Sequence, residues 1–548
     1  MAKVSFTFDG QEIEAEEGSP LIDAARNAGF QIPSMCYKEG YCAQNSCLTC
    51  VVKINGNPNV VPSCSRPVEA GMVVDSDCDE VWDVRKTALE LILSDHIGNC
   101  YAPCTAICPA KMEIPQMLRQ VGEGDYKGAI KTVKRDIPFP AILGRICPEV
   151  CEGGCRRGRY DSPEAICSIE RFVGDQDLLS EKPYRPEIKS SKGIKVAIVG
   201  AGITGLTAAY YLICEGFDVD VYEATDKPWG SLNSQFSTAE CPDKIKSAEV
   251  SFLESLGIKI HYKQALGETI SLEQLGESHQ STILALGKVD VDLIESQGLE
   301  MKAKKVAINA KTMQSTIKHV FIAGAMHHAK DRKVYSIAAG KSVSISVRQY
   351  LEGKPIVGRD KRFNSLSPTM KKDDIHITLE KTVNTKERYS PDGKLGTAFS
   401  AEEKPAFAND IAALESDRCL HCDCRAKDAC DLRDYSELVG ASQKHYQGKT
   451  RGFQALNQED HIHLDSGKCL QCGLCVQISQ DNGEKLGLSY EGRGFNTRIV
   501  VPFGQNLSDA LTHTAKECAE ACPTGAISFK EEEPTVNNPT EVVEAKKS

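Results

Sequence analysis

The stretch KVAIVGAGITGLTAAYYLICEGFDVDVYEA, residues 195–224, decides the fold of the central part of the chain. An apolar run leads into a GxGxxG turn, a helix opens at LTAAYYL, and a second apolar run ends at Glu223. Gly200 permits the tight turn, Gly202 lets the backbone approach a ligand, and Gly205 allows the helix to pack closely. This order predicts a strand, turn, helix and strand of a Rossmann-type domain.

The same motif favours a dinucleotide ligand. Its glycines admit a pyrophosphate at the helix N-terminus, and Glu223 can accept a hydrogen bond from a ribose hydroxyl. The stretch resembles the FAD-binding half of the glutamate synthase small subunit more than it resembles a nicotinamide site. The resemblance implies a bound FAD. The alternative is a fold that is retained without a nucleotide.

The rest of this domain departs from that family. KPWGSL stands where the family has GG-x-L, and only about 30 residues separate Gly287 from HVFIAGA, residues 319–325. A βαβ domain that binds NADPH does not fit in that interval, so we expect no NAD(P) subdomain. In the family an aspartate follows the AG and contacts the ribityl-phosphate region, and replacing it by Ala325 costs roughly 1–3 kcal/mol of binding. The candidate cofactor-binding residues are Gly200, Gly202, Thr204, Gly205, Glu223, Gly324 and Ala325.

Composition limits the other possibilities. The chain of 548 residues is 41% hydrophobic with a formal net charge of −11, which is typical of several globular domains and excludes a basic nucleic-acid binder. No long apolar run and no signal peptide are visible, so we expect a cytoplasmic protein without direct membrane insertion. The 24 cysteines gather mainly within 36–78, 100–167, 419–430 and 469–522. In a chain without a secretion signal, such groups predict metal sites rather than disulfides.

Residues 1–85 are predicted to form a ferredoxin-like β-grasp domain with a [2Fe-2S] cluster. KVSFTFDGQEIEAE is typical of a hairpin around its DG turn. The spacing C-x10-C-x2-C-x13-C belongs to Cys36, Cys47, Cys50 and Cys64. It resembles the [2Fe-2S] domain of the large iron-sulfur subunit of respiratory complex I and of related multi-cluster hydrogenases. A competing set begins at Cys42 and ends with Cys64 or Cys78, in the plant-type ferredoxin spacing.

Residues 86–185 are predicted to form a helical domain with two [4Fe-4S] clusters. The phrases PFP, GRICP, CEGGCRR and IERF resemble the N-terminal domain of the glutamate synthase small subunit and of dihydropyrimidine dehydrogenase. In that family two cysteine runs interlock around two clusters. The first run here has only Cys100, Cys104 and Cys108, where the family has four cysteines, so one ligand is missing.

The resemblance implies two crossed ligand sets. The first set comprises Cys100, Cys104, Cys155 and either His96 or another group. His96 is a candidate because H-x3-C also opens the His-ligated cluster motif of the complex I subunit. The second set comprises Cys108, Cys147, Cys151 and either Glu170 or Cys167, because the family places a glutamate or glutamine ligand at the IERF position. His96 and Glu170 could equally be ordinary polar residues without a metal.

The FAD-binding domain is expected to span 193–355, followed by a linker at 356–405, a C-terminal iron-sulfur domain at 406–530 and a disordered tail at 531–548. One set of this C-terminal domain crowds Cys419, Cys422, Cys424 and Cys430 into twelve residues. It favours a [4Fe-4S] cluster over zinc, although spacing alone does not exclude zinc. The other set joins C-x2-C-x2-C to a distant Cys-Pro and comprises Cys469, Cys472, Cys475 and Cys522. It again resembles complex I and the iron-only hydrogenases, with Cys518 as a spare.

Together these motifs predict a multidomain α+β and α/β protein with one [2Fe-2S] cluster, up to four [4Fe-4S] clusters and FAD. We expect an electron-transfer subunit of a soluble multi-subunit oxidoreductase from an organism with anaerobic metabolism. The resemblance implies two partners, an NAD(P)H-oxidising flavoprotein subunit and a catalytic subunit such as a formate dehydrogenase or hydrogenase. One alternative is a self-contained flavoenzyme that reduces a substrate or bifurcates electrons at its own FAD. The other is a flavin-free iron-sulfur scaffold. No catalytic residue is predicted.

Overall fold

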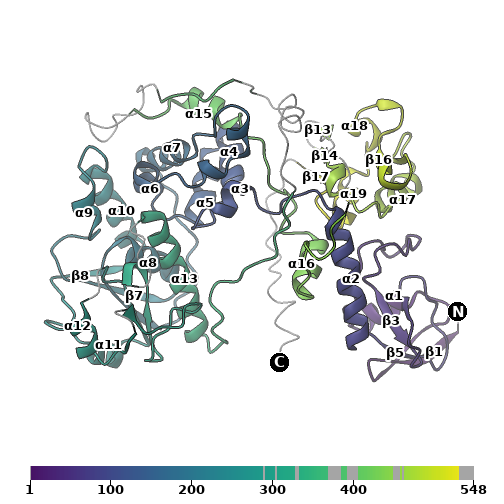
Figure 1. The fold of residues 1–548 in the computed structure, drawn as a ribbon, viewed down its shortest axis with the longest axis horizontal. Helices are drawn as coiled ribbons and strands as arrows, with labels where there is room; N and C mark the ends of the chain where they lie inside the picture. Colours follow the sequence, from purple (N-terminus) through teal and green to yellow (C-terminus); the bar gives the residue numbers. More distant parts are fainter. Residues whose placement is uncertain are drawn as a thin grey trace. The chain divides into compact units, whose positions relative to one another are not determined.

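The chain divides into two compact units, which are drawn in Figure 1. The computed structural model describes residues 2–287, 290–302, 305–326, 332–367, 384, 386–391, 405–448, 457–458 and 462–529. Unit 1 comprises Met1–Tyr101, Arg362–Lys381 and Cys422–Ser548. Unit 2 comprises Ala102–Lys361 and Thr382–His421. The sequence of unit 2 is therefore inserted within the sequence of unit 1. The expected disordered tail, and most of the expected linker, lie outside the described residues.

Unit 1 begins with a five-stranded sheet in the order β2-β1-β5-β3-β4. Its strands are β1 (Lys3–Phe8), β2 (Gln11–Glu16), β3 (Val51–Ile54), β4 (Val60–Pro62) and β5 (Val73–Asp75). β1 and β2 form the predicted hairpin, because Asp9 and Gly10 both adopt positive φ, at 46° and 80°. Helix α1 (Leu21–Asn27) contributes Leu21 and Ile22 to the apolar core beneath the sheet.

The remaining parts of unit 1 follow helix α2 (Asp79–Asp95), which packs on α16 (Asp431–Leu438). β14 (Ile462–Leu464) pairs with both β13 (Asn457–Gln458) and β17 (Ile527–Phe529). The other elements here are α17 (Leu474–Asp481), β15 (Ser489–Glu491), β16 (Arg498–Val500), α18 (Leu507–Ala510) and α19 (Ala515–Ala521). A core of buried apolar residues, among them Ile462, Ile478 and Leu507, holds this part together.

Unit 2 begins with a helical part. Its helices are α3 (Pro103–Ile107), α4 (Ile114–Gly122), α5 (Tyr126–Lys134), α6 (Pro140–Ile146), α7 (Ile166–Leu179) and, from later in the chain, α15 (Asn409–Ser416). Two short 3-10 turns, η1 (Glu152–Gly154) and η2 (Arg156–Arg159), lie between α6 and α7. α6 and α7 approach closely, because a Cβ on Gly144 would stand 2.4 Å from the backbone nitrogen of Arg171.

The Rossmann-type part of unit 2 has a parallel sheet in the order β12-β9-β6-β7-β8. The strands are β6 (Lys195–Val199), β7 (Asp218–Glu223), β8 (Lys259–Tyr262), β9 (Ser281–Leu284) and β12 (Val320–Ile322). The main helices are α8 (Ile203–Cys214), α10 (Asp243–Ser255), α11 (Leu272–Ser278) and α13 (Lys333–Leu351). α8 packs directly on α13, where a Cβ on Gly340 would stand 2.5 Å from the Thr204 carbonyl oxygen.

The segment between β9 and β12 is short. Its described residues form only α12 (Val291–Ser296) and a small pair of strands, β10 (Met301–Lys302) and β11 (Lys305–Val306). These elements do not amount to a second βαβ domain. The prediction of a mixed α/β multidomain protein is confirmed. In the part of the chain that the structure describes, no helix is both long enough and apolar enough to span a bilayer.

Candidate cofactor sites

The loop between α1 and β3 carries Cys36, Cys47 and Cys50 of the first cysteine set, and Cys64 joins them from just after β4. The Sγ atoms of Cys36 and Cys47 lie 3.3 Å apart, and Cys64 interacts with both Cys36 and Cys50. Hydrogen bonds among the four thiols lower the pKa of Cys36 and of Cys50, the latter to about 7, and raise the pKa of Cys47 and of Cys64. Four thiols that lie this close together are the donors that a [2Fe-2S] cluster requires, so this site fits such a cluster. Cys42, from the competing set, is exposed.

The last cysteine set surrounds one hollow in unit 1. Its lining includes Cys469, Cys472, Cys475 and Cys522. Gln471 has a positive φ of 57°, and its backbone N–H donates to Cys469 Sγ at 3.3 Å. Burial, aided by the charges of Cys522 and Cys469, raises the pKa of Cys472 to about 12. A positively charged cluster would relieve this repulsion between thiolates, so the donor set fits a [4Fe-4S] cluster. Cys518 instead donates its thiol to the carbonyl oxygen of Cys475 at 3.7 Å.

Helix α7 carries Cys167 and Glu170 to a second buried site, in unit 2. Hydrogen bonds with Cys147 and Cys151 raise the pKa of the Cys167 thiol. Burial, followed by the charges of Cys147 and Cys151, raises the pKa of the Glu170 carboxyl well above its usual range. The Oε1 atom of Glu170 is buried without a hydrogen-bond partner. Cys108 lies at the same site, where burial and the charge of Cys151 raise its pKa to about 12. An unsatisfied buried carboxyl oxygen at a site with four thiols fits a ligand of a metal cluster.

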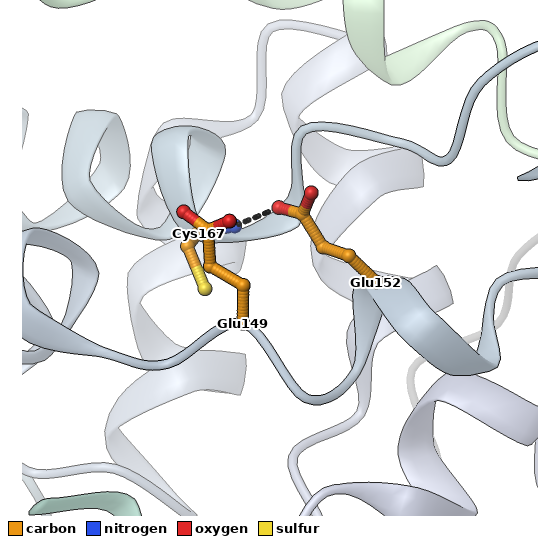
Figure 2. Close-up of side chains that lie close together, drawn as sticks. All are labelled: Glu149, Glu152 and Cys167. Carbon is orange, nitrogen blue, oxygen red and sulfur yellow. Dashed lines mark hydrogen bonds between the residues drawn. The ribbon is translucent and has the colours of Figure 1, made fainter.

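Two acids beside this site were missed by the sequence analysis. Figure 2 shows Glu149 and Glu152 next to Cys167. A carboxylate oxygen of each acid and the Cys167 Sγ all lie within 4.8 Å of one another. Glu152 accepts a hydrogen bond from the Cys167 backbone N–H at 3.2 Å and forms an ion pair with Arg388 at 2.6 Å. Both of its oxygens are therefore engaged in holding the loop. The signal was visible in the phrase CPEVCEGGC, whose acids stand between the cysteines.

The predicted set around Cys100 is divided by the two units. Cys104 is buried on α3, and Gly154 lies so close to α3 that a Cβ there would stand 3.2 Å from a backbone oxygen of that helix. Cys155 follows Gly154, which places it near Cys104 within unit 2. Cys100, by contrast, belongs to unit 1, as does His96 at the end of α2. The ligand set of Cys100, Cys104, Cys155 and His96 stays a prediction.

The cysteines of the run 419–430 are divided in the same way. Cys419 belongs to unit 2, where the carbonyl oxygen of the preceding Arg418 accepts a hydrogen bond from Arg157 at 2.5 Å. Unit 1 contains Cys422, Cys424 and Cys430. Burial raises the pKa of the Cys424 and Cys430 thiols. A single cluster on all four cysteines also stays a prediction.

The glycine turn after β6 has the geometry that a pyrophosphate requires. Gly200 has a φ of 108°, and a Cβ there would stand 2.5 Å from the Ala285 carbonyl oxygen. A Cβ on Gly205 would stand 2.0 Å from the Gly200 carbonyl oxygen, so both positions need glycine. A Cβ on Gly202 would meet no atom within 4 Å, which leaves open space at the N-terminus of α8. Glu223 is buried and accepts a hydrogen bond from a backbone N–H of this turn at 2.8 Å.

The loop KPWGSL lies against the same turn. Trp229 has a φ of 77°, and its backbone N–H donates to the Ala201 carbonyl oxygen at 2.8 Å. Gly230 also has a positive φ, of 49°. The Trp229 ring is buried and packs edge-on against Phe139 at 5.1 Å. Both positions thus keep a left-handed backbone of the kind that favours glycine, and the tryptophan side chain is buried against the helical part of unit 2.

The HVFIAGA segment reaches the turn from β12. A Cβ on Gly324 would stand 2.8 Å from the Thr204 hydroxyl oxygen, so this glycine too is needed for close packing. Ala325 is exposed in a short 3-10 turn, η3 (Gly324–Met326). Lys333, the first residue of α13, is buried and donates to the Ser231 hydroxyl at 3.0 Å. The residues present fit FAD through the backbone of the turn, and Ala325 offers no side-chain acceptor.

Three segments of the chain match known domain families. Residues 1–78 match the 2Fe-2S iron-sulfur cluster binding domain, residues 94–182 match dihydropyrimidine dehydrogenase domain II with its 4Fe-4S cluster, and residues 195–237 match the FAD dependent oxidoreductase family. The predictions of [2Fe-2S], [4Fe-4S] and FAD as cofactors are therefore confirmed. So is the predicted resemblance to iron-sulfur subunits of oxidoreductases.

Curated relatives share about a third of the chain. The NAD-dependent dihydropyrimidine dehydrogenase subunit PreT of Escherichia coli O157:H7 is 32% identical over 189 residues, which cover 34% of this chain and 45% of that protein. The NADP(+)-dependent formate dehydrogenase subunit beta of Moorella thermoacetica is 30% identical over 207 residues, 34% of this chain and 29% of that protein. The NADPH-Fe(3+) oxidoreductase subunit beta of Geobacter sulfurreducens strain DL-1 / KN400 is 32% identical over 193 residues, 35% of this chain and 29% of that protein. The matched part thus spans less than half of each relative.

Proposed function

We propose that the chain is an electron-transfer subunit of a multi-subunit oxidoreductase. It relays electrons through its iron-sulfur clusters and its FAD, between an NAD(P)H-oxidising flavoprotein subunit and a catalytic subunit such as a formate dehydrogenase or hydrogenase. The names of the two beta subunits among its relatives, one from a formate dehydrogenase and one from an NADPH-dependent oxidoreductase, support both kinds of partner.

One hydrophobic cluster in unit 1 carries this proposal. It contains Cys36 and Cys47 of the first cysteine set and Cys430 of the run 419–430, and Cys472 of the last set packs against it. The residues between them are apolar, among them Met35, Leu89, Leu93 and Leu432. Cys472 lies close enough to Cys36 for that thiol's charge to contribute to the raised pKa of Cys472. Thiols from three cysteine sets therefore contribute to one apolar core. This arrangement would allow electrons to pass from one iron-sulfur cluster to the next.

The Rossmann-type part of unit 2 supports the proposal that the chain depends on partner subunits for its reaction. Its glycine turn fits FAD, and no second nucleotide domain occurs among the residues described between β9 and β12. A flavin with no nicotinamide domain beside it has to exchange electrons with the clusters or with another subunit. The chain's own residues therefore hold and shield the cofactors, while hydride chemistry belongs to the partner.

The test is a flavin, iron and sulfide assay of the anaerobically purified chain, followed by NADH or NADPH. We expect one FAD, about 18 iron atoms, and no bleaching by either nucleotide until an NAD(P)H-oxidising flavoprotein is added. Rapid bleaching of the chain alone would contradict the proposal and favour a self-contained flavoenzyme. Iron without FAD would favour a flavin-free scaffold.

A further inference from the structure

A buried lysine lies next to the glycine turn after β6. Lys333 is the first residue of α13 and is 3% exposed, and its ammonium group donates to the Ser231 hydroxyl at 3.0 Å. Ser231 directly follows Gly230, and a Cβ on Gly230 would stand 3.6 Å from the Gly202 Cα atom. The ammonium group of Lys333 is therefore held by the loop that packs on Gly202.

The helix that carries this lysine also packs on α8, and the two helices lie side by side in Figure 1. A Cβ on Gly340, about two turns after Lys333 in α13, would stand 2.5 Å from the Thr204 carbonyl oxygen. From the segment before α13, a Cβ on Gly324 would stand 2.8 Å from the Thr204 hydroxyl oxygen. The position of Lys333 is therefore fixed from two directions, by the packing of its helix on α8 and by the loop at Gly202.

The space in front of Gly202 suits the negative charge of a dinucleotide. The N-terminus of the 12-residue helix α8 presents backbone N–H groups and the positive end of the helix dipole. An ammonium group binds phosphate oxygens as a point charge, so it can add to these backbone donors. Glu223, the acid of this turn, already accepts hydrogen bonds from the backbone N–H groups of Ala201 at 2.8 Å and Thr225 at 3.0 Å. The helix N-terminus and Lys333 therefore both favour an anion in this space.

A second buried lysine near the same loop offers a comparison. Lys246, on α10, is 7% exposed, and its ammonium group donates to the Asn233 side-chain oxygen at 3.2 Å. The same group forms an ion pair with Asp243 at 2.6 Å. The positive charge of Lys246 is therefore balanced by an acid of its own helix.

We propose that Lys333 is a further FAD-binding residue, whose ammonium group is a partner of the pyrophosphate at the N-terminus of α8 and is held there by the Ser231 hydroxyl. The proposal rests on the FAD of the proposed function, and it adds to the site a side chain that the glycine motif does not include. It also gives a physical reason why the site can lack an acid at Ala325. A charged hydrogen bond to the phosphates offsets the hydrogen bond that is lost.

Binding of FAD and of ADP to the flavin-depleted full chain, with its clusters retained, tests this assignment, because ADP carries the pyrophosphate but no flavin ring. Lys333→Met removes the charge and keeps the length of the side chain. It should weaken both ligands by the same factor, about tenfold to a hundredfold. Lys246→Met should leave both affinities unchanged, because the Asp243 side chain that it leaves unpaired is 74% exposed. The iron content, which all variants should keep, shows that the chain is folded.

Two results of this experiment would overturn the proposal. The first is an unchanged affinity for FAD in Lys333→Met. The second is a weaker affinity for FAD with an unchanged affinity for ADP, because it would place the lysine at the flavin ring and away from the phosphates. If the original chain binds neither ligand, the FAD of the proposed function fails as well, so the two failures can be told apart.

Ser231→Ala separates a contact with FAD from a role in the loop alone. Ser231 is exposed, so this variant should fold even if Lys333→Met does not. It should weaken FAD and ADP less than Lys333→Met does, because the ammonium group remains and loses only the hydroxyl that holds it. An equal loss in both variants would mean that Lys333 acts only through the loop, and would overturn the proposal. Unchanged affinities in Ser231→Ala would overturn the part assigned to its hydroxyl.

Discussion

The cysteine sites of unit 1 differ from the glycine turn after β6 in unit 2, which we call the flavin turn, in the kind of group that would bind the cofactor. In unit 1 the donors are side chains, and thiols such as Cys36, Cys47 and Cys430 are buried in an apolar core. At the flavin turn the groups that would bind the pyrophosphate are backbone N–H groups around Gly202, where a Cβ would meet only open space. A metal site is therefore lost with one side chain. A nucleotide site tolerates changes such as Ala325 and Trp229, provided that its backbone keeps its shape.

The largest effect is expected at the last cysteine set. Cys472→Ser should remove one [4Fe-4S] cluster, about four of about 18 iron atoms, because the thiolate has no substitute in the hollow that it lines. Iron analysis and electron paramagnetic resonance measure the loss, and the [2Fe-2S] signal should remain. Cys518→Ser is the matched control, because that thiol is engaged with the Cys475 carbonyl oxygen. An unchanged spectrum in the Cys472 variant would contradict the ligand assignment.

The next largest effect, a loss of bound FAD, is expected when one methyl group is added to the flavin turn. Gly202 has a φ of −75°, which alanine adopts without strain, so Gly202→Ala should leave the fold intact. Its Cβ would occupy the space left for the pyrophosphate, and we expect the purified chain to lose most of its FAD while keeping its iron. Absorbance at the flavin band measures the FAD content, and iron analysis measures the iron content of the same sample. Gly448→Ala, where a Cβ also meets nothing within 4 Å, controls for the added methyl group. A variant that retains its FAD would show that the flavin does not use this turn.

A buried acid should make the stability of unit 2 depend on pH. Glu249 is fully buried without partners for either carboxyl oxygen, and burial raises its pKa from 4.5 to about 7. The native state therefore binds this proton more tightly than the unfolded state, so stability falls as pH rises from about 4.5 to about 7, by about 3 kcal/mol. Glu249→Gln should remove this loss and be the more stable protein at pH 8. Urea unfolding at pH 5 and pH 8 measures the free energy of unfolding of both proteins. The same change between the two pH values in both proteins would contradict this prediction.

The smallest effect on FAD binding is expected at position 325, where a side chain would add one contact to those that the backbone provides. Ala325→Asp should tighten FAD retention by roughly 1–3 kcal/mol, since it restores one hydrogen bond at an exposed position of η3. Flavin release during dilution or dialysis measures the change, with Ala325→Asn as a control that keeps the size but not the charge. No gain would indicate that the loop has been reshaped for another purpose.

Local spacing predicted the sites whose ligands lie in one loop or in one small domain. Cys36, Cys47 and Cys50 converge because the loop that carries them is short, and the glycine turn at Gly200 follows from the steric demands of its own backbone. The contact between Cys100 and Cys424 could not be predicted in this way. The whole sequence of unit 2 separates these two residues, and spacing carries no information at that range.

Two further residues show the same limit. The role of Glu152 depends on Arg388, which lies far along the chain and holds its second oxygen. In the sequence, Trp229 stands where the family has a glycine. Its backbone nevertheless keeps the left-handed conformation, because its ring is buried against Phe139. Tertiary packing can thus preserve a turn that the residue type alone argues against.

The central claim is that the clusters of unit 1 form one path for electrons, and spin relaxation of the [2Fe-2S] cluster tests it most directly. In the fully reduced chain, a neighbouring paramagnetic [4Fe-4S] cluster held by Cys472 should speed the relaxation of the [2Fe-2S] signal, because both sites contact one hydrophobic cluster. In Cys472→Ser the relaxation should slow while the signal itself persists. The same relaxation rate in both proteins would mean that the two clusters do not interact, and would contradict the account of the chain as an electron conduit.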